Sequence, residues 1–304
     1  MAQSGEDNKP ALLILGARGF LGSAVSVAAG GSHRIIRADR NRLSQDTDVL
    51  VDIADRTQVN SALRKLRPDC VLLLAAISDV DRCEREPEHA WAVNLHGVEN
   101  VANACAQTGS RLLFTSTGAV FDGRKIGYVE SDPVSPVSVY AQTKAAAESV
   151  AMDLVPSALV VRASLVLGRC ARPATNALVE SLRRRWERGE KVRASVNEWR
   201  NPVDVRTLAT WIMELFANPK ARGIVHTGGL QAVSRYEIAT ALAARLGVDR
   251  WLVEPEVESP PGRAHRGPHQ HLICNRLPLL CATPIPAIET VFERSLRATA
   301  QAGV

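Results

Sequence analysis

The sequence predicts an α/β fold, with a doubly wound parallel sheet followed by a smaller C-terminal lobe. Up to about residue 165, apolar segments of strand length alternate with segments of helix length. Three glycines follow the first apolar segment, and after Gly168 the alternation gives way to an arginine-rich stretch. Strands that are apolar throughout are typical of a parallel sheet covered by helices on both faces. Ligands of such sheets bind at the carboxyl ends of the strands.

The individual segments can be assigned in chain order. The predicted strands cover residues 12–15, 35–37, 71–75, 111–116 and 158–163, and helices are predicted after the glycines and at 57–65, 87–108 and 139–152. Pro87 suits a first helical position, where no N–H donor is needed. Later segments favour a helix at 176–188, a strand at 223–227, a helix at 234–246 and a loop at 255–268. Ser234 and Glu237 have the spacing of a capping box at the start of the helix at 234–246.

The first strand ends in a glycine motif, Gly16-x-x-Gly19-x-x-Gly22. Gly16 permits a tight turn, Gly19 allows a pyrophosphate to approach the backbone, and Gly22 allows the helix to pack closely on the strand. Phosphates would bind at the helix N-terminus, where free N–H groups and the helix dipole favour anions. The motif therefore predicts a nucleotide site.

Asp39 strengthens this prediction. It closes the second predicted strand, 23 positions after Gly16, and a carboxylate about 20 residues after the first glycine typically binds the ribose hydroxyls of a dinucleotide. Arg37, Arg40 and Arg42 surround it, and arginines there can instead hold a 2′-phosphate. The cofactor is therefore NAD or NADP, and the sequence leaves the choice open.

These motifs define the expected domain organisation. We expect residues 1–9 to form a disordered tail and residues 10–165 to form an NAD(P)-binding Rossmann domain. Residues 166–304 would form mainly the substrate lobe, with a segment at about 203–228 returning to the first domain. The cleft between the two lobes is the expected site.

A second motif, Tyr140-Ala141-Gln142-Thr143-Lys144, carries the chemistry. Tyr140 and Lys144 are four residues apart on a predicted helix and so share one face. An ammonium stabilises a nearby phenolate, so Lys144 is expected to lower the pKa of Tyr140 from its usual value of about 10. Tyr140 would then protonate an alkoxide as hydride reaches a carbonyl carbon. Ser116 and Thr117 end the strand at 111–116, where either hydroxyl can bind the substrate carbonyl.

The composition restricts the possible functions. The 304 residues carry a net charge of +5 with a pI near 9.0, in keeping with an anionic ligand. No basic block is interleaved with aromatic residues, so a nucleic-acid partner is not expected. The longest apolar run, at 70–77, is too short to cross a membrane. The six cysteines form no Cys-x-x-Cys pair and residues 1–9 lack the apolar core of a signal peptide, which together predict a cytoplasmic protein.

With these motifs, the sequence resembles the extended short-chain dehydrogenase/reductase family and, within it, the dTDP-4-dehydrorhamnose reductase branch. The resemblance spans nearly the whole chain and is densest up to Gly168. It also rests on Arg67-Pro68-Asp69, Ala75-Ala76, Asp79-Val80-Asp81-Arg82-Cys83-Glu84, Val93-Asn94, Ser116-Thr117, Val120-Phe121-Asp122-Gly123, Glu130 and Arg162-Ala163-Ser164. Weaker matches are Arg200-Asn201-Pro202, His226-Thr227-Gly228 and Ser234-Arg235-Tyr236-Glu237.

The resemblance implies roles for individual residues. Cofactor contacts are implied for Gly16, Arg18, Gly19, Phe20, Leu21, Gly22, Asp39, Arg40, Tyr140 and Lys144, with Asp52 and Ile53 beside the adenine and Ala75 and Ala76 along the middle of the cofactor. Thr117 or Ser116, Tyr140 and Lys144 would be catalytic, and Asn94 would hold a structural position in a helix. The implied substrate is a nucleotide-linked 4-keto-6-deoxysugar, whose keto group would be reduced.

The sequence departs from this branch at Gly118-Ala119, where the reductase pattern has Asp-Tyr. Two groups that would touch the sugar are therefore missing, although the carbonyl chemistry is retained. The same two residues argue against a sugar-nucleotide 4,6-dehydratase, which needs an acidic pair beside the threonine for acid and base catalysis.

Three hypotheses follow. The leading one is an NAD(P)H-dependent reductase of a keto group on a nucleotide-linked sugar, acting as a homodimer. A nucleotide-sugar epimerase is the alternative enzyme, because small residues at Gly118 and Ala119 leave room for a ketone intermediate to rotate. A non-catalytic NAD(P)-binding subunit is the third, because the regulatory subunit of methionine adenosyltransferase is similar to the same branch and fold alone does not fix activity.

The remaining expectations concern three sets of acidic, histidine and arginine residues. Asp79, Asp81 and Glu84 are more typical of solvated loop carboxylates than of a metal site, so no metal is expected. His269 and His271 are likewise expected to be solvated. From the run Arg183-Arg184-Arg185 with Arg188, one or two arginines can reach a substrate pyrophosphate, because consecutive residues of a helix do not share a face.

Overall fold

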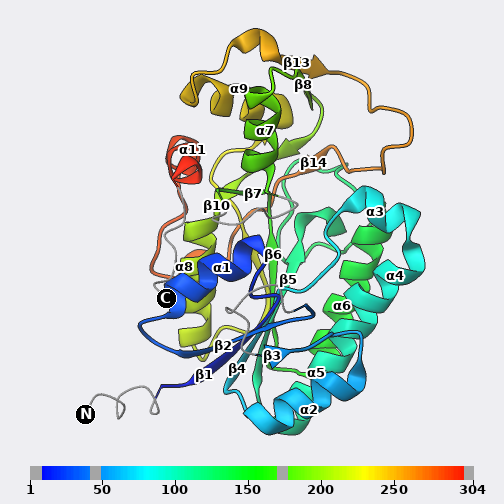
Figure 1. Ribbon diagram of the computed structural model, residues 1–304, viewed down its shortest axis with the longest axis vertical. Helices are drawn as coiled ribbons and strands as arrows, with labels where there is room; N and C mark the ends of the chain where they lie inside the picture. Colours follow the sequence, from blue (N-terminus) through cyan, green and yellow to red (C-terminus); the bar gives the residue numbers. More distant parts are fainter. Residues whose placement is uncertain (1–8, 42–48, 170–176, 298–304) are drawn as a thin grey trace.

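The centre of the molecule is a seven-stranded parallel sheet in the order β11-β6-β5-β4-β1-β2-β3 (Figure 1). The computed structural model describes residues 9–41, 49–169 and 177–297. The strands are β1 (Ala11–Leu15), β2 (Arg34–Asp39), β3 (Val49–Leu50), β4 (Cys70–Leu73), β5 (Arg111–Thr117), β6 (Leu159–Ala163) and β11 (Gly223–Thr227). The strand order reverses between β1 and β4, so their carboxyl ends form the topological switch point. The predicted doubly wound α/β fold is confirmed.

Strand β1 shows why its sequence is apolar throughout. Ala11, Leu13 and Leu15 face the core on one side of the sheet, and Leu12 and Ile14 face the core on the other. All five residues are at most 3% exposed. A strand buried on both faces has no position for a polar side chain, so the usual alternation is absent.

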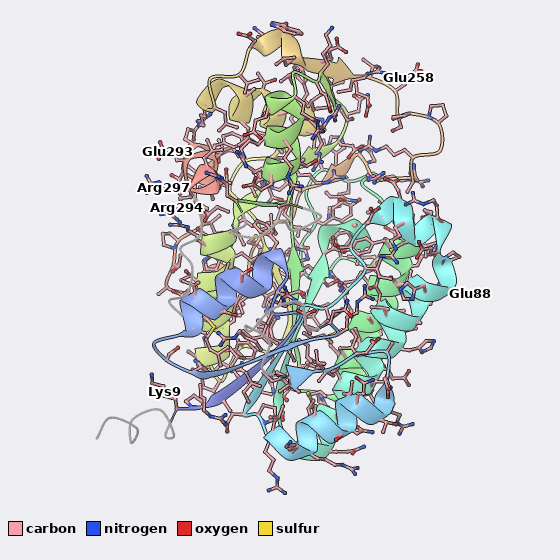
Figure 2. All side chains as sticks on the ribbon, viewed as in Figure 1. Lys9, Glu88, Glu258, Glu293, Arg294 and Arg297 are labelled. Atoms are coloured by element: carbon pink, nitrogen blue, oxygen red, sulfur yellow. The ribbon has the colours of Figure 1, made fainter. Side chains whose placement is uncertain are left out.

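Helices cover both faces of the sheet. Helices α2 (Arg56–Leu66), α5 (Gly97–Thr108) and α6 (Val139–Leu154) pack on one face, and α1 (Phe20–Ala29) and α8 (Val205–Ala217) pack on the other (Figure 1). Short helices α3 (Val80–Arg85) and α4 (Pro87–Trp91) follow β4. The charged side chains labelled in Figure 2, among them Glu88 and Glu258, project outward from this framework.

The helix predicted at 87–108 contains an irregular turn. Residues Ala92–His96 form a π-helical turn between α4 and α5. Asn94 lies in this turn with no exposed surface; its Oδ1 accepts from Ile77 N at 2.8 Å, and its Nδ2 donates to Ile77 O at 3.0 Å and to Thr143 Oγ1 at 3.2 Å. These bonds tie the loop after β4 to α6, which agrees with the structural position implied for Asn94.

A second core lies beyond the sheet. It is formed by α7 (Leu178–Glu187), β8 (Val192–Ser195), α9 (Arg235–Arg245), β13 (Val253–Glu256) and α11 (Ile288–Leu296). The remaining elements are β7 (Val166–Leu167), β9 (Trp199–Arg200), β10 (Val203–Asp204), β12 (Val233–Ser234), β14 (His269–Gln270), α10 (Leu277–Leu280) and the 3₁₀ turns Gly118–Val120 and Arg250–Leu252. The capping box predicted for Ser234 and Glu237 is confirmed at the start of α9.

The domain boundaries predicted from the sequence stay a prediction, although β11 does join the main sheet. The expected tail lies outside the described residues, apart from Lys9, as do Arg42, Cys170 and the first residue of the helix predicted at 176–188. Among the helices of residues 9–41, 49–169 and 177–297, none combines the length and apolar character needed to cross a membrane.

Candidate active site

The glycine turn lies at the switch point of the sheet and has no room for side chains. Gly16 has φ +89°, and a Cβ atom there would lie 2.8 Å from Ala75 N. A Cβ atom on Gly22 would lie 2.4 Å from Gly16 O. Gly19 is the N-cap of α1 and is exposed. The turn therefore brings the free N–H groups at the start of α1 to the carboxyl edge of the sheet, where they can bind an anion.

Asp39 reaches this turn from the end of β2. Its Oδ2 accepts from Arg18 N at 3.0 Å, which fixes the carboxylate beside the glycines. Within the described chain, Arg18 Nε is buried without a hydrogen-bond partner. Arg40 follows β2 and is exposed. A carboxylate held beside an anion-binding turn suits a group that carries both phosphates and ribose hydroxyls.

The other predicted cofactor residues lie around the same edge. Phe20 and Leu21 are the first residues of α1, and Ala75 and Ala76 follow β4 and are half-buried. Asp52 follows β3 and accepts from Ala54 N at 3.0 Å. Ile53 is buried, and its side chain packs on α5 at Gly97. A Cβ atom added to Gly97 would lie only 2.8 Å from Ile53 Cδ1.

Helix α6 delivers the predicted catalytic pair. Its N-cap is Ser138, whose Oγ accepts from Ala141 N at 3.3 Å, and Tyr140 and Lys144 lie on the face turned toward β5. Thr117, the last residue of β5, lies close enough to the Tyr140 phenol to lower its pKa, and its own Oγ1 accepts from Ala119 N at 3.1 Å. The structure therefore brings Thr117, Tyr140 and Lys144 together.

Ser116 is arranged differently from Thr117. Its side chain is 6% exposed, and its Oγ has no hydrogen-bond partner within the described residues. Thr117, by contrast, acts on the pKa of the Tyr140 phenol, and its Oγ1 accepts from Ala119 N. Thr117 is thus the hydroxyl that the geometry favours for binding a carbonyl, and a role for Ser116 stays a prediction.

The electrostatics of this pair differ from the sequence-based expectation. Burial raises the pKa of Tyr140 to about 12, against a smaller lowering by the Thr117 hydrogen bond. Burial lowers the pKa of Lys144 to about 7. Both shifts have the same cause, because desolvation disfavours the charged form of either group. Tyr140 is therefore fully protonated at neutral pH, and the charge on Lys144 is marginal there.

The acidic cluster singled out in the sequence serves the framework around this pair. Asp79 caps α3 by accepting from Arg82 N at 2.9 Å, and Glu84 accepts from Val139 N at 2.8 Å, which ties α3 to the start of α6. Cys83, between them, is fully buried. Within the described ranges, no group of three or more His, Cys, Asp or Glu side chains is arranged to hold a metal ion.

The third carboxylate of the cluster, Asp81, binds the loop between β13 and β14. Its Oδ1 accepts from Ala264 N at 2.8 Å and its Oδ2 pairs with Arg266 Nη2 at 2.9 Å. These contacts hold the Pro- and Gly-rich loop to α3; the loop runs along the upper right edge of the molecule in Figure 1. The pKa of Asp81 is lowered, chiefly by the hydrogen bond from Arg266.

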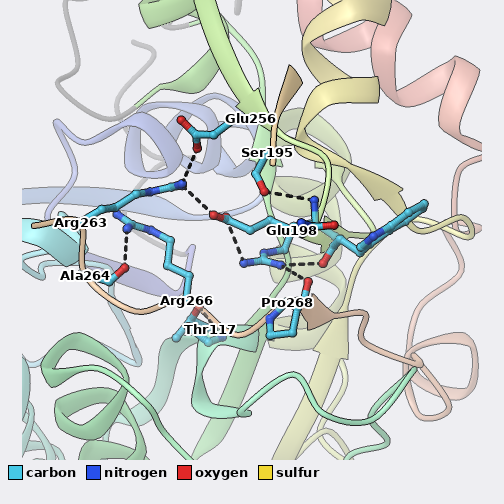
Figure 3. Close-up of polar contacts among 12 residues, drawn as sticks. Thr117, Ser195, Glu198, Glu256, Arg263, Ala264, Arg266 and Pro268 are labelled. Carbon is cyan, nitrogen blue, oxygen red and sulfur yellow. Dashed lines mark hydrogen bonds and ion pairs between the residues drawn. The ribbon is translucent and has the colours of Figure 1, made fainter. Parts of the chain in front are cut away.

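This loop also borders a cavity of about 260 Å³ in the C-terminal part of the molecule. Its charged lining residues are Arg185, Arg193, Arg235, Arg263 and Glu256. Figure 3 shows Arg263 between two carboxylates, with Nη2 2.8 Å from Glu198 Oε1 and Nη1 2.9 Å from Glu256 Oε2. Arginine exceeds carboxylate in this lining, so the cavity suits an anionic ligand.

Of the arginine run on α7, Arg185 lines this cavity. Arg183 instead pairs with Glu180 and Glu187, and Arg188 pairs with Glu190. Burial lowers the pKa of Arg235; the charge of Glu198 opposes this lowering, and the neighbouring charges of Arg263 and Arg266 add to it. An anion in the cavity would relieve this repulsion among the arginines.

Comparison with known proteins identifies the family. The sequence profile of the RmlD substrate-binding domain matches residues 10–300. The chain belongs to the RmlD substrate-binding domain family. One relative, the dTDP-4-dehydrorhamnose reductase of Mycobacterium tuberculosis, is 31% identical to this chain over 297 residues. The match covers 95% of this chain and 93% of that protein. The resemblance found in the sequence is thereby confirmed.

Two other proteins similar to this chain have known names that concern function. The crystal structure of a dTDP-4-dehydrorhamnose reductase from Bacillus anthracis in complex with NADP superposes with a TM-score of 0.85 at 26% identity, covering 94% of this chain and 98% of that chain. The β subunit of methionine adenosyltransferase 2 from Xenopus laevis is 26% identical over 270 residues, covering 87% of this chain and 80% of that protein.

Proposed function

We propose that this protein is an NAD(P)H-dependent reductase of a keto group on a nucleotide-linked deoxysugar, like the dTDP-4-dehydrorhamnose reductases. The observation that carries the proposal is the convergence of Thr117, Tyr140 and Lys144 at the carboxyl end of β5, at the same edge of the sheet as the glycine turn. A non-catalytic nucleotide-binding protein does not require this arrangement. Oxidation of reduced nicotinamide by a keto-sugar nucleotide is the direct test.

The residues present fit a nicotinamide dinucleotide. Gly16 and Gly22 leave only backbone at the turn, the Asp39 carboxylate lies beside it, and buried Arg18 Nε lacks a partner within the described residues. The pyrophosphate would bind at the start of α1 and the adenosine ribose at Asp39. When bound, the reduced nicotinamide supplies the hydride for reduction of the carbonyl.

The protein's own residues then bind the carbonyl and deliver the proton. Thr117 donates a hydrogen bond and orients the substrate oxygen toward Tyr140. Tyr140 is protonated before the reaction because its pKa is about 12, and it transfers its proton to the oxygen as the carbonyl is reduced. A charged Lys144 stabilises the phenolate that remains.

The nucleotide part of the substrate is proposed to occupy the arginine-lined cavity. Arg185, Arg235 and Arg263 come from α7, α9 and the loop before β14, so they converge from separate elements. Guanidinium groups bind phosphate oxygens bidentately. Gly118 and Ala119, where the branch has Asp-Tyr, would leave the sugar pocket wider than in the reductases.

Replacing Arg235 by glutamine is expected to raise the KM for the nucleotide-sugar about tenfold with kcat within about threefold, because it removes binding shared by ground and transition states. Steady-state kinetics at saturating cofactor measure this change. Arg183→Gln is the matched control, since Arg183 pairs with Glu180 and Glu187 and does not line the cavity. An equal effect of both variants would rule out the cavity as the nucleotide site.

Replacing Asp39 by asparagine is expected to lower the preference for NADH over NADPH by about tenfold in kcat/KM, because a carboxylate repels a 2′-phosphate. Asparagine keeps an oxygen that can accept from Arg18 N, so the turn is preserved. Asp69→Asn is the control, since Asp69 accepts from Ala11 N at the opposite end of β1. An unchanged cofactor ratio in Asp39→Asn would show that Asp39 does not face the ribose.

We further propose a cytoplasmic location and a homodimer. The location is supported by the free thiols of Cys70, Cys83, Cys105, Cys274 and Cys281 within the described residues. The homodimer rests on the general preference of soluble enzymes for twofold assemblies. The regulatory-subunit alternative is favoured by the similarity to methionine adenosyltransferase β subunits, and the epimerase alternative by the small residues Gly118 and Ala119.

A further inference from the structure

A buried ion pair lies directly behind the catalytic helix. Glu148 is on α6, one turn after Lys144, and Arg162 is in the neighbouring strand β6. Both are 2% exposed. Arg162 Nε donates to Glu148 Oε1 at 3.0 Å and to Oε2 at 3.1 Å, and Arg162 Nη2 donates to Oε2 at 2.7 Å. This geometry fixes α6 on the sheet at the level of the active site.

Lys144 has neutral groups as its direct contacts. Its Nζ donates to Thr115 O at 2.7 Å and lies 4.0 Å from the centre of the Phe114 ring. Its side chain is 3% exposed, and no carboxylate of the described chain lies within ion-pair distance of it. The carboxylate of Glu148, four residues later on the same helix face, is the negative group that acts on Lys144.

We infer that the Glu148–Arg162 ion pair is a positioning element of the reaction: Arg162 clamps α6 onto β6, and Glu148 supplies the negative charge that keeps Lys144 an ammonium beside Tyr140. The inference rests on the proposed function, because Lys144 needs its charge only if Tyr140 gives up a proton. Glu148 touches neither substrate nor cofactor in this account and acts through Lys144.

The balance of charges around Lys144 explains why Glu148 matters. Burial lowers the pKa of Lys144 to about 7, and the Glu148 charge opposes that lowering. Among the described residues, Cys83 on α3 is the other titratable group that acts on Lys144, and its thiol is neutral at pH 7 because burial raises its pKa to about 11. A lysine with a lowered pKa loses its charge as the pH rises through that value, so the ammonium is present below about pH 7 and lost above it.

Arg162 limits how much of the Glu148 charge Lys144 experiences. Beyond Glu148, the Arg162 guanidinium faces the Phe121 ring at 5.1 Å and His226 Nε2 at 3.5 Å. Burial lowers the pKa of His226 to about 4, so this imidazole is neutral at neutral pH. Glu148 therefore balances two buried cations, Arg162 directly and Lys144 across one helical turn.

The test is the titration of Lys144 in the protein without substrate. The chain has six lysines, so ¹³C-labelled lysine gives few NMR signals, and the Lys144 signal is assigned by its absence from Lys144→Met. Glu148→Gln is expected to lower the Lys144 titration midpoint by about one pH unit or more, since a charge within one helical turn has an effect of this size. Glu148→Asp, which keeps the charge, is expected to restore most of the midpoint.

Two further variants complete the test. Glu148→Gln leaves Arg162 unpaired and can fail to fold, so the double variant Glu148→Gln with Arg162→Gln removes both charges of the pair. The double variant is expected to lower the midpoint by less than Glu148→Gln alone, because Arg162 offsets part of the Glu148 charge. Glu180→Gln is the matched control, because Glu180 is a buried carboxylate paired with Arg169 and Arg183 on α7. A Lys144 midpoint in the double variant equal to that of the unaltered protein overturns the inference.

The pH dependence of kcat tests the role of Glu148 independently of the NMR titration. With the keto-sugar substrate, the alkaline limb of kcat is expected to move to lower pH in Glu148→Gln by the same amount as the Lys144 midpoint, with KM unchanged. A uniform loss of kcat at every pH would show a structural role alone and overturn the inference. If the midpoint moves but the unaltered protein reduces no keto-sugar, the proposed function fails while the electrostatic role of Glu148 stands.

Discussion

Tyr140→Phe is expected to lower kcat by about 10²- to 10⁴-fold, the usual contribution of a positioned proton donor. The phenylalanine ring fills the same space, so the fold and the affinity for the cofactor should not change. Thr117 keeps its own contact with Ala119 N. Single-turnover reduction of substrate by bound cofactor measures the chemical step, and cofactor titration measures binding separately.

The chain offers a matched control for this variant. Tyr236 is on α9 and packs against the second hydrophobic core, away from α6. Tyr236→Phe removes the same hydroxyl type and should leave kcat within about twofold. If Tyr140→Phe retained full activity, another group would have to donate the proton, and the assignment of Tyr140 would be wrong.

Gly22→Ala is expected to weaken cofactor binding by about 10- to 100-fold, equivalent to about 1.4–2.8 kcal/mol. The added Cβ atom would lie 2.4 Å from Gly16 O and 2.7 Å from Ala17 O, both backbone atoms, so the turn must move. Moving it displaces the N–H groups at the start of α1 that would hold the pyrophosphate. Isothermal titration with NAD and NADP measures the loss.

Gly31→Ala separates this effect from a general effect of alanine. A Cβ atom on Gly31 would meet nothing within 4 Å, so this variant should bind the cofactor with unchanged affinity. Gly22→Ala is also expected to lower the free energy of unfolding by about 1–3 kcal/mol through overpacking. Cofactor binding in Gly22→Ala equal to that of the unaltered protein would show that the turn does not hold the pyrophosphate.

Short-range patterns predicted the fold and the framework of the site. The glycine spacing, the apolar strand before it and the four-residue separation of Tyr140 and Lys144 each depend on neighbours along one strand or helix, so they are visible in the sequence. Asp39 is predictable for the same reason, because it ends the next strand along the chain after the glycine turn. The structure places it on Arg18 N, beside the glycine turn.

Contacts between distant segments were not predictable in the same way. Glu148 and Arg162 are 14 residues apart on different elements, and Arg266 reaches Asp81 across 185 residues. Glu84 is exposed as expected, but its carboxylate also accepts from Val139 N, a contact across 55 residues. Each of these pairs depends on how helices pack on the sheet, and no local spacing encodes that packing. The π-helical turn at Asn94 has the same origin.

The direction of the pKa shift at Tyr140 could not be predicted from the sequence. Helical spacing places an ammonium near a phenol and so predicts a lowered pKa, whereas burial raises the pKa of Tyr140 to about 12 and lowers that of Lys144 to about 7. Desolvation depends on the complete packing of α3, α6 and β5, and the sequence alone does not give its size.

The pair Gly118-Ala119 concerns the substrate rather than the chemistry. Gly118 is buried, and a Cβ atom there would lie 3.4 Å from the Leu272 side chain. Ala119 is half-buried and follows Thr117, the proposed catalytic hydroxyl, by two residues. We expect the absence of the branch's Asp-Tyr pair to widen the sugar pocket while Thr117, Tyr140 and Lys144 stay in place.

Reduction of a nucleotide-linked keto sugar by this protein can be tested by measuring cofactor and product in one reaction. The purified protein is incubated with dTDP-4-dehydrorhamnose and NADH or NADPH, and cofactor absorbance is followed together with the mass of the sugar nucleotide. We expect one reduced cofactor to be consumed for each sugar that gains two hydrogen atoms. An isomerised sugar of unchanged mass with no cofactor consumed, or no turnover with either cofactor, would contradict it.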